Sequence, residues 1–477
     1  MVRSAALVLN HQALSADPDA YREIARGLAL CKTFGIVSFA SDIQGSDSVP
    51  VAIPTAFRPP LYPWVLSWFT EPDGSLANQT VAFLHLFFGL LTVGMTFLIA
   101  RRILPMRQSQ RESEQTPRPG MPLNPERRLW AASFAAILVM IDPLLIQSSS
   151  LVMTETLATL LATTCWWLWL RLLDAITTDE SLGNAVTRRV MGSGLLLGTA
   201  FSLAYLCRPT FIVWPALITV YLVGWGLKRK SGRPLFAAIA MLLMVAITVG
   251  AWTARNLKEL GHPVWATTHG GYTLLLGNNP PFYEHLRTTG ASKVPFWRQN
   301  WDPQYFFERW EERHAGDPRL AEFWERDRER AASSDLAANE KPMVVRGELA
   351  EDRLAYETAK SLIQRDPQGF LLACRWRWER LLSPLPLQTG DRPSKMLLAV
   401  GGFYTLTFLL VFSGLWRLRY ELAMPEWAPA ITLCVALAAV HTIYWTDMRM
   451  RAPAVPVLSI LAAASMPTRL FGTRKIA

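Results

Sequence analysis

The 477-residue chain is poor in charged residues and in cysteine. Charged residues make up 18% of it and hydrophobic residues 51%, whereas an ordinary soluble domain has about 25% charged residues. This composition excludes a disordered protein and argues against one large water-soluble enzyme. No two of the five cysteines stand at C-x-x-C spacing, so the sequence predicts neither a disulfide framework nor a zinc knuckle.

The chain is rich in long apolar runs. A membrane-spanning helix needs about 20 mostly apolar residues, and a stretch such as 235–250 has no charged residue to present to water. The sequence therefore predicts an all-α polytopic membrane protein. Its nine candidate spans are 79–103, 129–147, 151–170, 190–207, 210–227, 234–254, 395–415, 428–446 and 452–467.

The formal net charge of +10 is unevenly distributed along the chain. If the amino terminus lies outside and the spans alternate, the cytoplasmic connections carry a net charge of +12, and the long external segment 255–394 carries zero. Lys and Arg in short connections mark the cytoplasmic side. We therefore interpret the positive charge as a topology signal and predict no binding to nucleic acid.

These spans divide the chain into four regions. Residues 1–78 form an external first segment with amphipathic helices along the membrane surface, and 79–254 form a six-helix membrane region. Residues 255–394 form an extracytoplasmic helical cap, and 395–477 a three-helix membrane region with a basic cytoplasmic tail. Residues 1–78 contain no apolar run of about 20 residues that could carry them across the membrane. Either the first span translocates this polar segment, or a preceding membrane helix is encoded upstream, and we expect the second.

Ionisable residues gather at the outer ends of these spans. In the external first segment, Asp17 and Asp19 precede an amphipathic stretch that starts at Tyr21, and Arg58 precedes a second one at 60–69. Ionisable groups at a membrane boundary are costly unless they are paired or hydrated, so they are candidates for function. The others are Glu155, Arg208, Arg255, Asp447, Arg449 and Arg451.

Each of these residues also has a purely structural interpretation. Asp17 is suited to capping the helix that follows it, and Arg208, Arg449 and Arg451 are suited to anchoring the chain at the membrane surface. Convergence on one face favours function instead. Guanidinium groups bind phosphate in a fork and stay charged when buried, and a nearby carboxylate can take a proton from a hydroxyl.

The chain resembles the GT-C superfamily of polyprenyl-phosphate-sugar-dependent glycosyltransferases, most of all the branch of protein O-mannosyltransferases and aminoarabinose transferases. The matching pieces follow the family order on a consistent side of the membrane. They are 17–21, 57–63, 154–155, 208–209, 252–256, 269–280, 356–367 and 449–453.

The resemblance implies a GT-C-like helix bundle in a bacterial inner membrane, with the active site facing outside. It implies transfer of a single sugar from a polyprenyl-phosphate donor to a hydroxyl of a lipid, glycan or protein acceptor, by inverting displacement. The general base would be Asp17 by its spacing to Tyr21, with Asp19 as the rival or a metal-side helper. Arg58, Arg208 and Arg255 are expected near the donor phosphate.

Further substrate-binding candidates follow from the same resemblance. A divalent metal ion is left open as a cofactor, and membrane lipids are the other expected partners. Two alternative functions are a transporter or flippase for a polar lipid, and a non-catalytic relative. The further candidates are Tyr21, Tyr62, Glu155, Asn256, Asn278, Arg449 and Arg451.

The predicted sidedness can be tested by labelling. We expect a cysteine introduced within 300–340 to react with a membrane-impermeant maleimide in intact cells, and one within 107–128 to stay unlabelled until the membrane is opened. The reverse pattern would mean that Asp17, Asp19 and the guanidinium groups do not meet on the external side of the membrane. The chain without an added cysteine is the control for its five native thiols.

Overall fold

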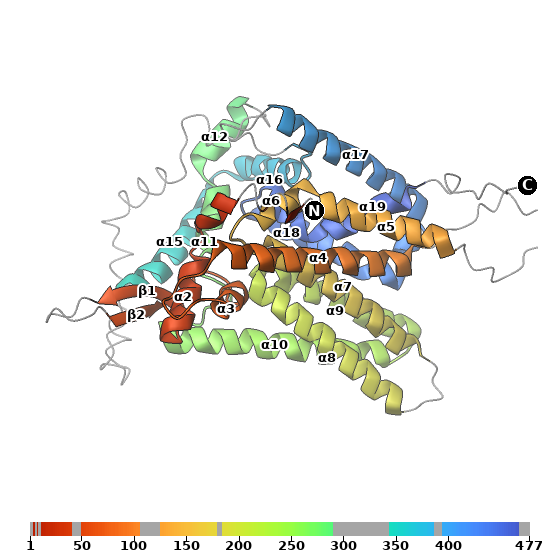
Figure 1. The fold of residues 1–477 in the computed structure, drawn as a ribbon, viewed down its shortest axis with the longest axis horizontal. Coiled ribbons are helices and arrows are strands. Elements are labelled where there is room, and N and C mark those ends of the chain that lie inside the picture. The colour runs from red at the N-terminus through yellow and green to blue at the C-terminus, as the bar shows by residue number, and fades with distance from the viewer. Residues whose placement is uncertain are drawn as a thin grey trace, which may run out of the picture.

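The computed structural model describes residues 3–4, 7, 11–40, 49–104, 125–178, 184–289, 343–385 and 394–466. Most of these residues are helical, and the long helices run beside one another across the view of Figure 1. A hairpin and several shorter helices gather at the left-hand end of this bundle (Figure 1). Within the predicted helical cap at 255–394, residues 290–342 lie outside the described residues.

Seven of the described helices are long and apolar enough to cross a membrane. Each matches a span predicted from sequence, with ends shifted by a few residues. They are α4 (Asn78–Ile103), α7 (Glu155–Thr177), α8 (Asn184–Cys207), α9 (Val213–Arg229) with the 3-10 turn η4 (Pro209–Ile212), α10 (Arg233–Leu260), α17 (Ser394–Leu418), and α18 (Ala428–Ile443) with η7 (Pro425–Trp427).

An eighth span is formed if a bent pair of helices is counted as one. Helix α5 (Pro125–Ile141) and helix α6 (Pro143–Ser149) meet at an angle of 48°. The cause is local, because Pro143 has no N–H to continue the first helix and the Asp142 carboxylate accepts the N–H of Leu145 at 2.9 Å as a new cap.

The prediction of nine spans is corrected at 452–467. The described part of this run forms the 3-10 helix η8 (Met448–Ala454) and α19 (Val455–Ala464). Helix α19 has 10 residues, so it is about 15 Å long and too short to cross a hydrocarbon layer of about 30 Å alone. Pro453 and Pro456 explain why the apolar run does not form one long helix.

The prediction of an all-α fold also needs a correction, because residues 1–78, which were predicted to be external, contain a β-hairpin. Strands β1 (Gly35–Ala40) and β2 (Val49–Pro54) pair antiparallel, with Gly35 opposite Pro54 and Ala40 opposite Val49. The β-branched and aromatic residues in these two runs favour the extended conformation of a strand. The two runs have six residues each, which is too short to stand out beside the long apolar helices.

Two short helices flank the hairpin at the positions expected from the sequence. Helix α2 (Tyr21–Cys31) buries Tyr21, Ile24 and Ala25 on one face. Helix α3 (Leu61–Ser67) buries Leu61, Tyr62 and Leu66, while Trp64 stays exposed. The remaining helices near this end are α11 (Gly270–Gly277), α12 (Pro280–Thr289), α15 (Met343–Arg365) and α16 (Pro367–Leu381).

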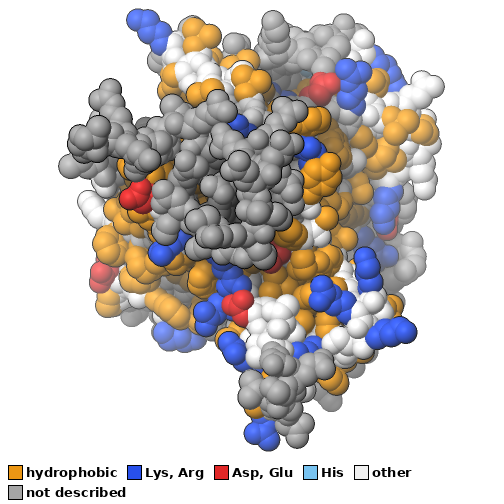
Figure 2. Space-filling view, turned by 90° about the vertical axis from the view of Figure 1, so that its right-hand side faces the viewer, with side chains coloured by type: hydrophobic (Ala, Val, Ile, Leu, Met, Phe, Trp, Pro, Cys, Tyr) orange, Lys and Arg blue, Asp and Glu red, His pale blue; other side chains and the backbone are white. Residues whose placement is uncertain are grey.

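Basic residues mark the opposite end of the bundle. Helix α4 starts beside α2, where Arg22 donates to Asn78, and it ends at Arg101 and Arg102. Figure 2 views the molecule from the right-hand side of Figure 1, and there Lys and Arg side chains are prominent while Asp and Glu are few. The charge asymmetry predicted from sequence is therefore present along the helix axes.

Helices α8 and α10 approach each other closely at two glycines of α8. A Cβ atom at Gly194 would lie 2.8 Å from the carbonyl oxygen of Ala237, and one at Gly198 would lie 2.6 Å from that of Met241. Small residues at such a four-residue spacing let two membrane helices pack backbone to backbone. In contrast, a Cβ at Gly192 of the same helix would meet nothing within 4 Å.

We predict that Gly198→Ala lowers the stability of the protein in detergent by about 1–3 kcal/mol, because the added methyl group forces two packed helices apart. The matched control is Gly192→Ala, which adds the same methyl group in open space. Thermal unfolding of both variants provides the measurement. Equal melting temperatures for the two would contradict the close helix contact.

Candidate active site

A cavity of about 1250 Å³ opens at the end of the bundle that carries the hairpin. Segments far apart in the sequence contribute to its wall, including residues before α2, the start of α7, the end of α8 and one face of α15. Six of the predicted site residues line it. They are Asp19, Tyr21, Arg58, Glu155, Arg208 and Arg449.

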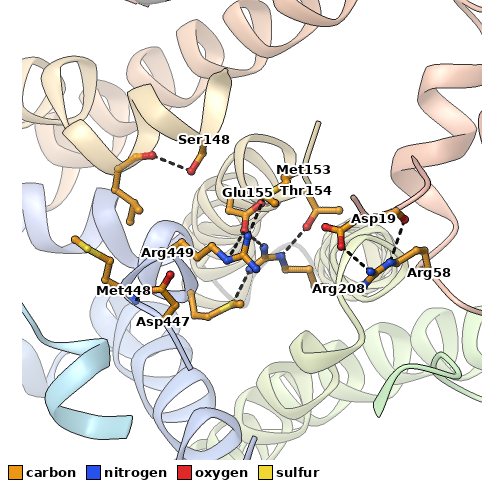
Figure 3. A network of polar contacts seen from close by, with 12 residues as sticks. Asp19, Arg58, Ser148, Met153, Thr154, Glu155, Arg208, Asp447, Met448 and Arg449 are labelled. Carbon is orange, nitrogen blue, oxygen red and sulfur yellow. Dashed lines mark hydrogen bonds and ion pairs between the residues drawn. The ribbon is translucent and has the colours of Figure 1, made fainter. Parts of the chain in front are cut away.

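Glu155 and two arginines form the central charged group of this cavity (Figure 3). The Glu155 carboxylate lies 2.7 Å from Nη2 of Arg208 and 4.0 Å from Nε of Arg449. Its side chain is 3% exposed. Glu155 is the first residue of α7, where the helix dipole favours a negative charge. With two cations around one anion, the group carries one uncompensated positive charge.

Neighbouring side chains hold the two guanidinium groups. Arg208 donates from Nε to the hydroxyl of Thr154 at 2.9 Å, and Arg449 contacts the sulfur of Met153 at 3.1 Å. Neither Oε2 of Glu155 nor Nε of Arg449 has a hydrogen-bond partner. The group therefore retains hydrogen-bonding capacity beside the cavity.

Asp19 and Arg58 form a second charged pair in the same cavity wall (Figure 3). Nη2 of Arg58 lies 2.5 Å from Oδ1 of Asp19, and Nε of Arg58 donates to the Asp19 carbonyl at 3.1 Å. The guanidinium carbon also lies 4.3 Å from the centre of the Phe57 ring. Both charges of this pair are therefore compensated within the protein.

Asp17 has a different position from Asp19. Its two carboxylate oxygens accept the backbone N–H groups of Tyr21 at 3.0 Å and Arg22 at 2.7 Å, which caps the first turn of α2. Burial raises the pKa of Asp17, and the two backbone hydrogen bonds oppose this rise. Asp17 is not among the residues that line the cavity.

Tyr62 packs behind the cavity. Its hydroxyl lies 2.7 Å from Nε2 of His85, and Nδ1 of His85 lies 2.8 Å from the carbonyl oxygen of Ser149. A carbonyl can only accept, so Nδ1 carries the proton and Nε2 accepts from Tyr62. The ring of Tyr62 meets that of Tyr21 edge to face at 5.1 Å and so supports a residue that does line the cavity.

Arg255 and Asn256 hold the base of the hairpin and do not line the cavity. Arg255 donates to the carbonyl oxygens of Thr55 at 2.7 Å and Phe34 at 2.6 Å, the residues next to the paired ends of β2 and β1. The side chain of Asn256 accepts from Arg255 and donates to the carbonyl of Val264. Their contacts position the first external segment.

Asn278 and Arg451 are also bound within the protein and lie outside the cavity lining. Asn278 donates to the carbonyl of Ile443 at 3.0 Å and accepts from Arg377 at 2.7 Å. Arg451 donates to the carbonyls of Leu381 and Ser383. These contacts join α11, α16, α18 and η8 to one another.

One face of α15 contributes cavity residues that the sequence analysis did not select. Glu348, Glu351, Asp352 and Tyr356 follow helical spacing and line the cavity. The sequence signal that could have identified this face is the helical spacing of its three carboxylates, within the segment 255–394, whose net charge is zero. Within the described residues no group of three or more His, Cys, Asp or Glu side chains is arranged to hold a metal ion.

Two of these carboxylates attach α15 to the rest of the site. Glu348 accepts from the hydroxyl of Thr55 at 2.5 Å and the N–H of Ala56 at 3.0 Å. Asp352 accepts the N–H of Gly271 at 2.6 Å. A Cβ at Gly271 would lie 2.0 Å from the Asp352 carbonyl oxygen, so the glycine permits this approach of α11 and α15.

The chain matches no family model and no curated protein. It is similar to solved structures of two proteins. One is the archaeal oligosaccharyltransferase AglB from Archaeoglobus fulgidus in complex with an inhibitory peptide and a dolichol-phosphate, at 12% identity over 97% of this chain and 50% of that one, with a TM-score of 0.46. This chain therefore spans about half the length of AglB.

The other protein is ArnT from Cupriavidus metallidurans. Its structure bound to undecaprenyl phosphate shares 16% identity over 97% of this chain and 76% of that one, with a TM-score of 0.35. The apo structure gives 15% identity and the same score. The predicted resemblance is confirmed as structural similarity at low identity. At these scores it carries no conclusion about the reaction, which has to be argued from the site.

The pKa of Asp352 gives a prediction for this site. Burial, with a smaller effect of Glu348, raises it from 3.8 to about 6. The folded protein therefore holds this proton more tightly than the unfolded chain, and stability falls as the pH rises through this range. Asp352→Asn keeps an acceptor for the N–H of Gly271 but cannot ionise.

We expect Asp352→Asn to match the wild type near pH 4 and to exceed its stability by up to about 3 kcal/mol near pH 7.5, since one pKa unit corresponds to about 1.4 kcal/mol. Thermal unfolding in detergent across this pH range provides the measurement. A stability difference that does not change with pH would contradict the effect of burial on this carboxyl group.

Proposed function

We propose that the protein is a membrane glycosyltransferase. It transfers a single sugar from a polyprenyl-phosphate donor to an acceptor hydroxyl of a lipid, glycan or protein. The observation that carries this proposal is the joint presence, in one cavity, of an arginine group with an uncompensated positive charge and of a separate carboxylate, Asp19, in an ion pair with Arg58. Phosphate and a reacting hydroxyl need these two kinds of group.

Arg208 and Arg449 are the proposed ligands of the donor phosphate. Their charge exceeds that of Glu155 by one, which matches the single negative charge of a phosphodiester. Guanidinium groups bind phosphate oxygens in a fork, and a fixed positive charge in a partly dehydrated site stabilises the negative charge that develops on a leaving phosphate. Glu155 positions both arginines and keeps them from repelling each other.

Asp19 is the proposed general base, in preference to Asp17. Both oxygens of Asp17 already accept backbone N–H groups, whereas Asp19 lines the cavity and its side chain is 24% exposed. Asp19 would take the proton of the acceptor hydroxyl while that oxygen attacks the anomeric carbon from the side opposite the phosphate. Such a base contributes about 10²–10⁴-fold in rate, and a single displacement inverts the anomeric centre.

The proposed reaction takes place on the extracytoplasmic side, in a bacterial inner membrane. Support comes from the basic residues at the other end of the helices, such as Arg101, Arg102, Lys228 and Arg229, because basic ends lie in the cytoplasm. The spanning helices would surround the polyprenyl tail, so membrane lipids are the second class of partner.

The first experiment identifies the reaction. Mass spectrometry of lipids and surface glycans from a deletion strain is expected to show the loss of one sugar, restored by the wild-type gene. Purified protein with the corresponding polyprenyl-phosphate sugar then gives a transfer assay. A strain with unchanged glycans and lipids but altered movement of a polar lipid across the membrane would favour the transporter alternative.

We predict that Asp19→Asn lowers the transfer rate about 10²–10⁴-fold, because the general base is lost, and does not weaken donor binding. Asp17→Asn is expected to retain most of the activity, since its role is to cap α2. Glu357→Gln, at an exposed carboxylate of α15 paired with Arg353, is the matched control. Full activity of Asp19→Asn would remove Asp19 from the mechanism.

A further inference from the structure

Arg58 is positioned to respond to the charge of Asp19. In the resting cavity its positive charge is compensated by the Asp19 carboxylate at 2.5 Å. A second bond, from Nε to the Asp19 carbonyl at 3.1 Å, does not depend on that charge, and neither does the contact with the Phe57 ring. If Asp19 becomes neutral, the guanidinium therefore stays in place and its charge becomes available.

The proposed reaction changes the charge of two groups together. The acceptor O–H bond breaks and its proton goes to Asp19, while the acceptor oxygen forms a bond to the anomeric carbon. The bond from that carbon to the phosphate oxygen breaks, and its electron pair stays on the phosphate. Asp19 changes from one negative charge to none, and the phosphate from one negative charge to two, so the total charge is unchanged.

We propose that Arg58 couples these two changes. Its guanidinium is neutralised by Asp19 before the reaction, and it stabilises the second negative charge of the leaving phosphate once Asp19 has taken the proton. This inference rests on the proposed function. The positive charge that Arg58, Arg208 and Arg449 make available then rises from one to two as the negative charge of the phosphate rises from one to two, without a movement of the backbone.

Contacts through Tyr21 place the two charged groups in one neighbourhood. The ring of Tyr21 lies 5.9 Å from the guanidinium carbon of Arg58, and Tyr21 lines the same cavity as Asp19, Arg58, Glu155 and Arg208. Figure 3 shows the Asp19–Arg58 pair beside the Thr154–Arg208 contact. A phosphate bound at Arg208 would therefore lie in the cavity that Arg58 also lines.

The coupling has a consequence for release of the product. As long as Asp19 holds the proton, two positive charges retain the polyprenyl phosphate. When Asp19 gives the proton to water, its carboxylate pairs again with Arg58 and the affinity for the doubly charged phosphate falls. The Asp19–Arg58 ion pair, which is present before the reaction, would therefore also promote release of the product when it forms again.

Equilibrium binding of undecaprenyl phosphate to the full-length protein in nanodiscs tests this inference. Asp19→Asn reproduces the uncharged form of Asp19 with the same shape. We expect it to bind undecaprenyl phosphate roughly tenfold more tightly than the wild type, equivalent to about 1.4 kcal/mol. The double variant Asp19→Asn/Arg58→Gln, which lacks both charges, is expected to bind about as tightly as the wild type, because the freed charge is no longer there.

Two controls accompany this binding cycle. Asp17→Asn removes a carboxylate only two positions away and is expected to leave the affinity unchanged. Undecaprenol, which has the same tail without phosphate, is expected to bind all variants alike. These controls separate the charge of Asp19 from general effects on the fold of the first external segment and on the lipid-facing surface.

The outcomes distinguish the two proposals. If wild-type protein binds undecaprenyl phosphate but Asp19→Asn does not bind it more tightly, or if the double variant binds it as tightly as Asp19→Asn alone, the coupling is overturned and the glycosyltransferase proposal stands. If the wild type and all variants fail to distinguish undecaprenyl phosphate from undecaprenol, the proposed phosphate site itself is overturned.

Discussion

A carboxylate buried at the start of a membrane helix has to be neutralised, and this requirement organises the site. Glu155 is almost fully buried and reaches Arg208 at the end of α8 and Arg449 in η8. Burying one charge without its partner costs several kcal/mol, so the three helix ends are held in one place. The surplus of one positive charge then follows from having two arginines around one acid.

A second set of contacts fixes the wall that faces this group. Arg255 binds both sides of the hairpin base, and Glu348 binds the residues that follow β2. The first external segment and α15, nearly 300 residues apart in the chain, are thereby joined around one cavity. Asp19 and Arg58 belong to this wall, which explains how the segment before α4 can supply the proposed base.

In the proposed reaction, charge is transferred between Asp19 and the phosphate, and the total charge of the site stays constant. The arginine group is permanently positive by one unit, and the Asp19–Arg58 pair is neutral until a proton arrives. A site of this kind suits a donor that gains one negative charge on leaving. In the resting protein neither of the two groups carries more than one uncompensated charge, and a larger charge would be costly at the boundary of a membrane.

The sequence by itself determined the membrane-spanning helices, their polarity and half of the candidate site, because hydrophobicity and charge along the chain act locally. It marked Arg208 and Arg449 as residues at the outer ends of spans. Only the tertiary structure decided that Asp17 caps a helix while Asp19 faces the cavity, and that Arg255 binds carbonyl groups of the hairpin. It also revealed the six-residue strands and the acidic face of α15. The physical reason is that a polar side chain takes its role from the partners the fold brings to it, and these partners lie far away in the sequence.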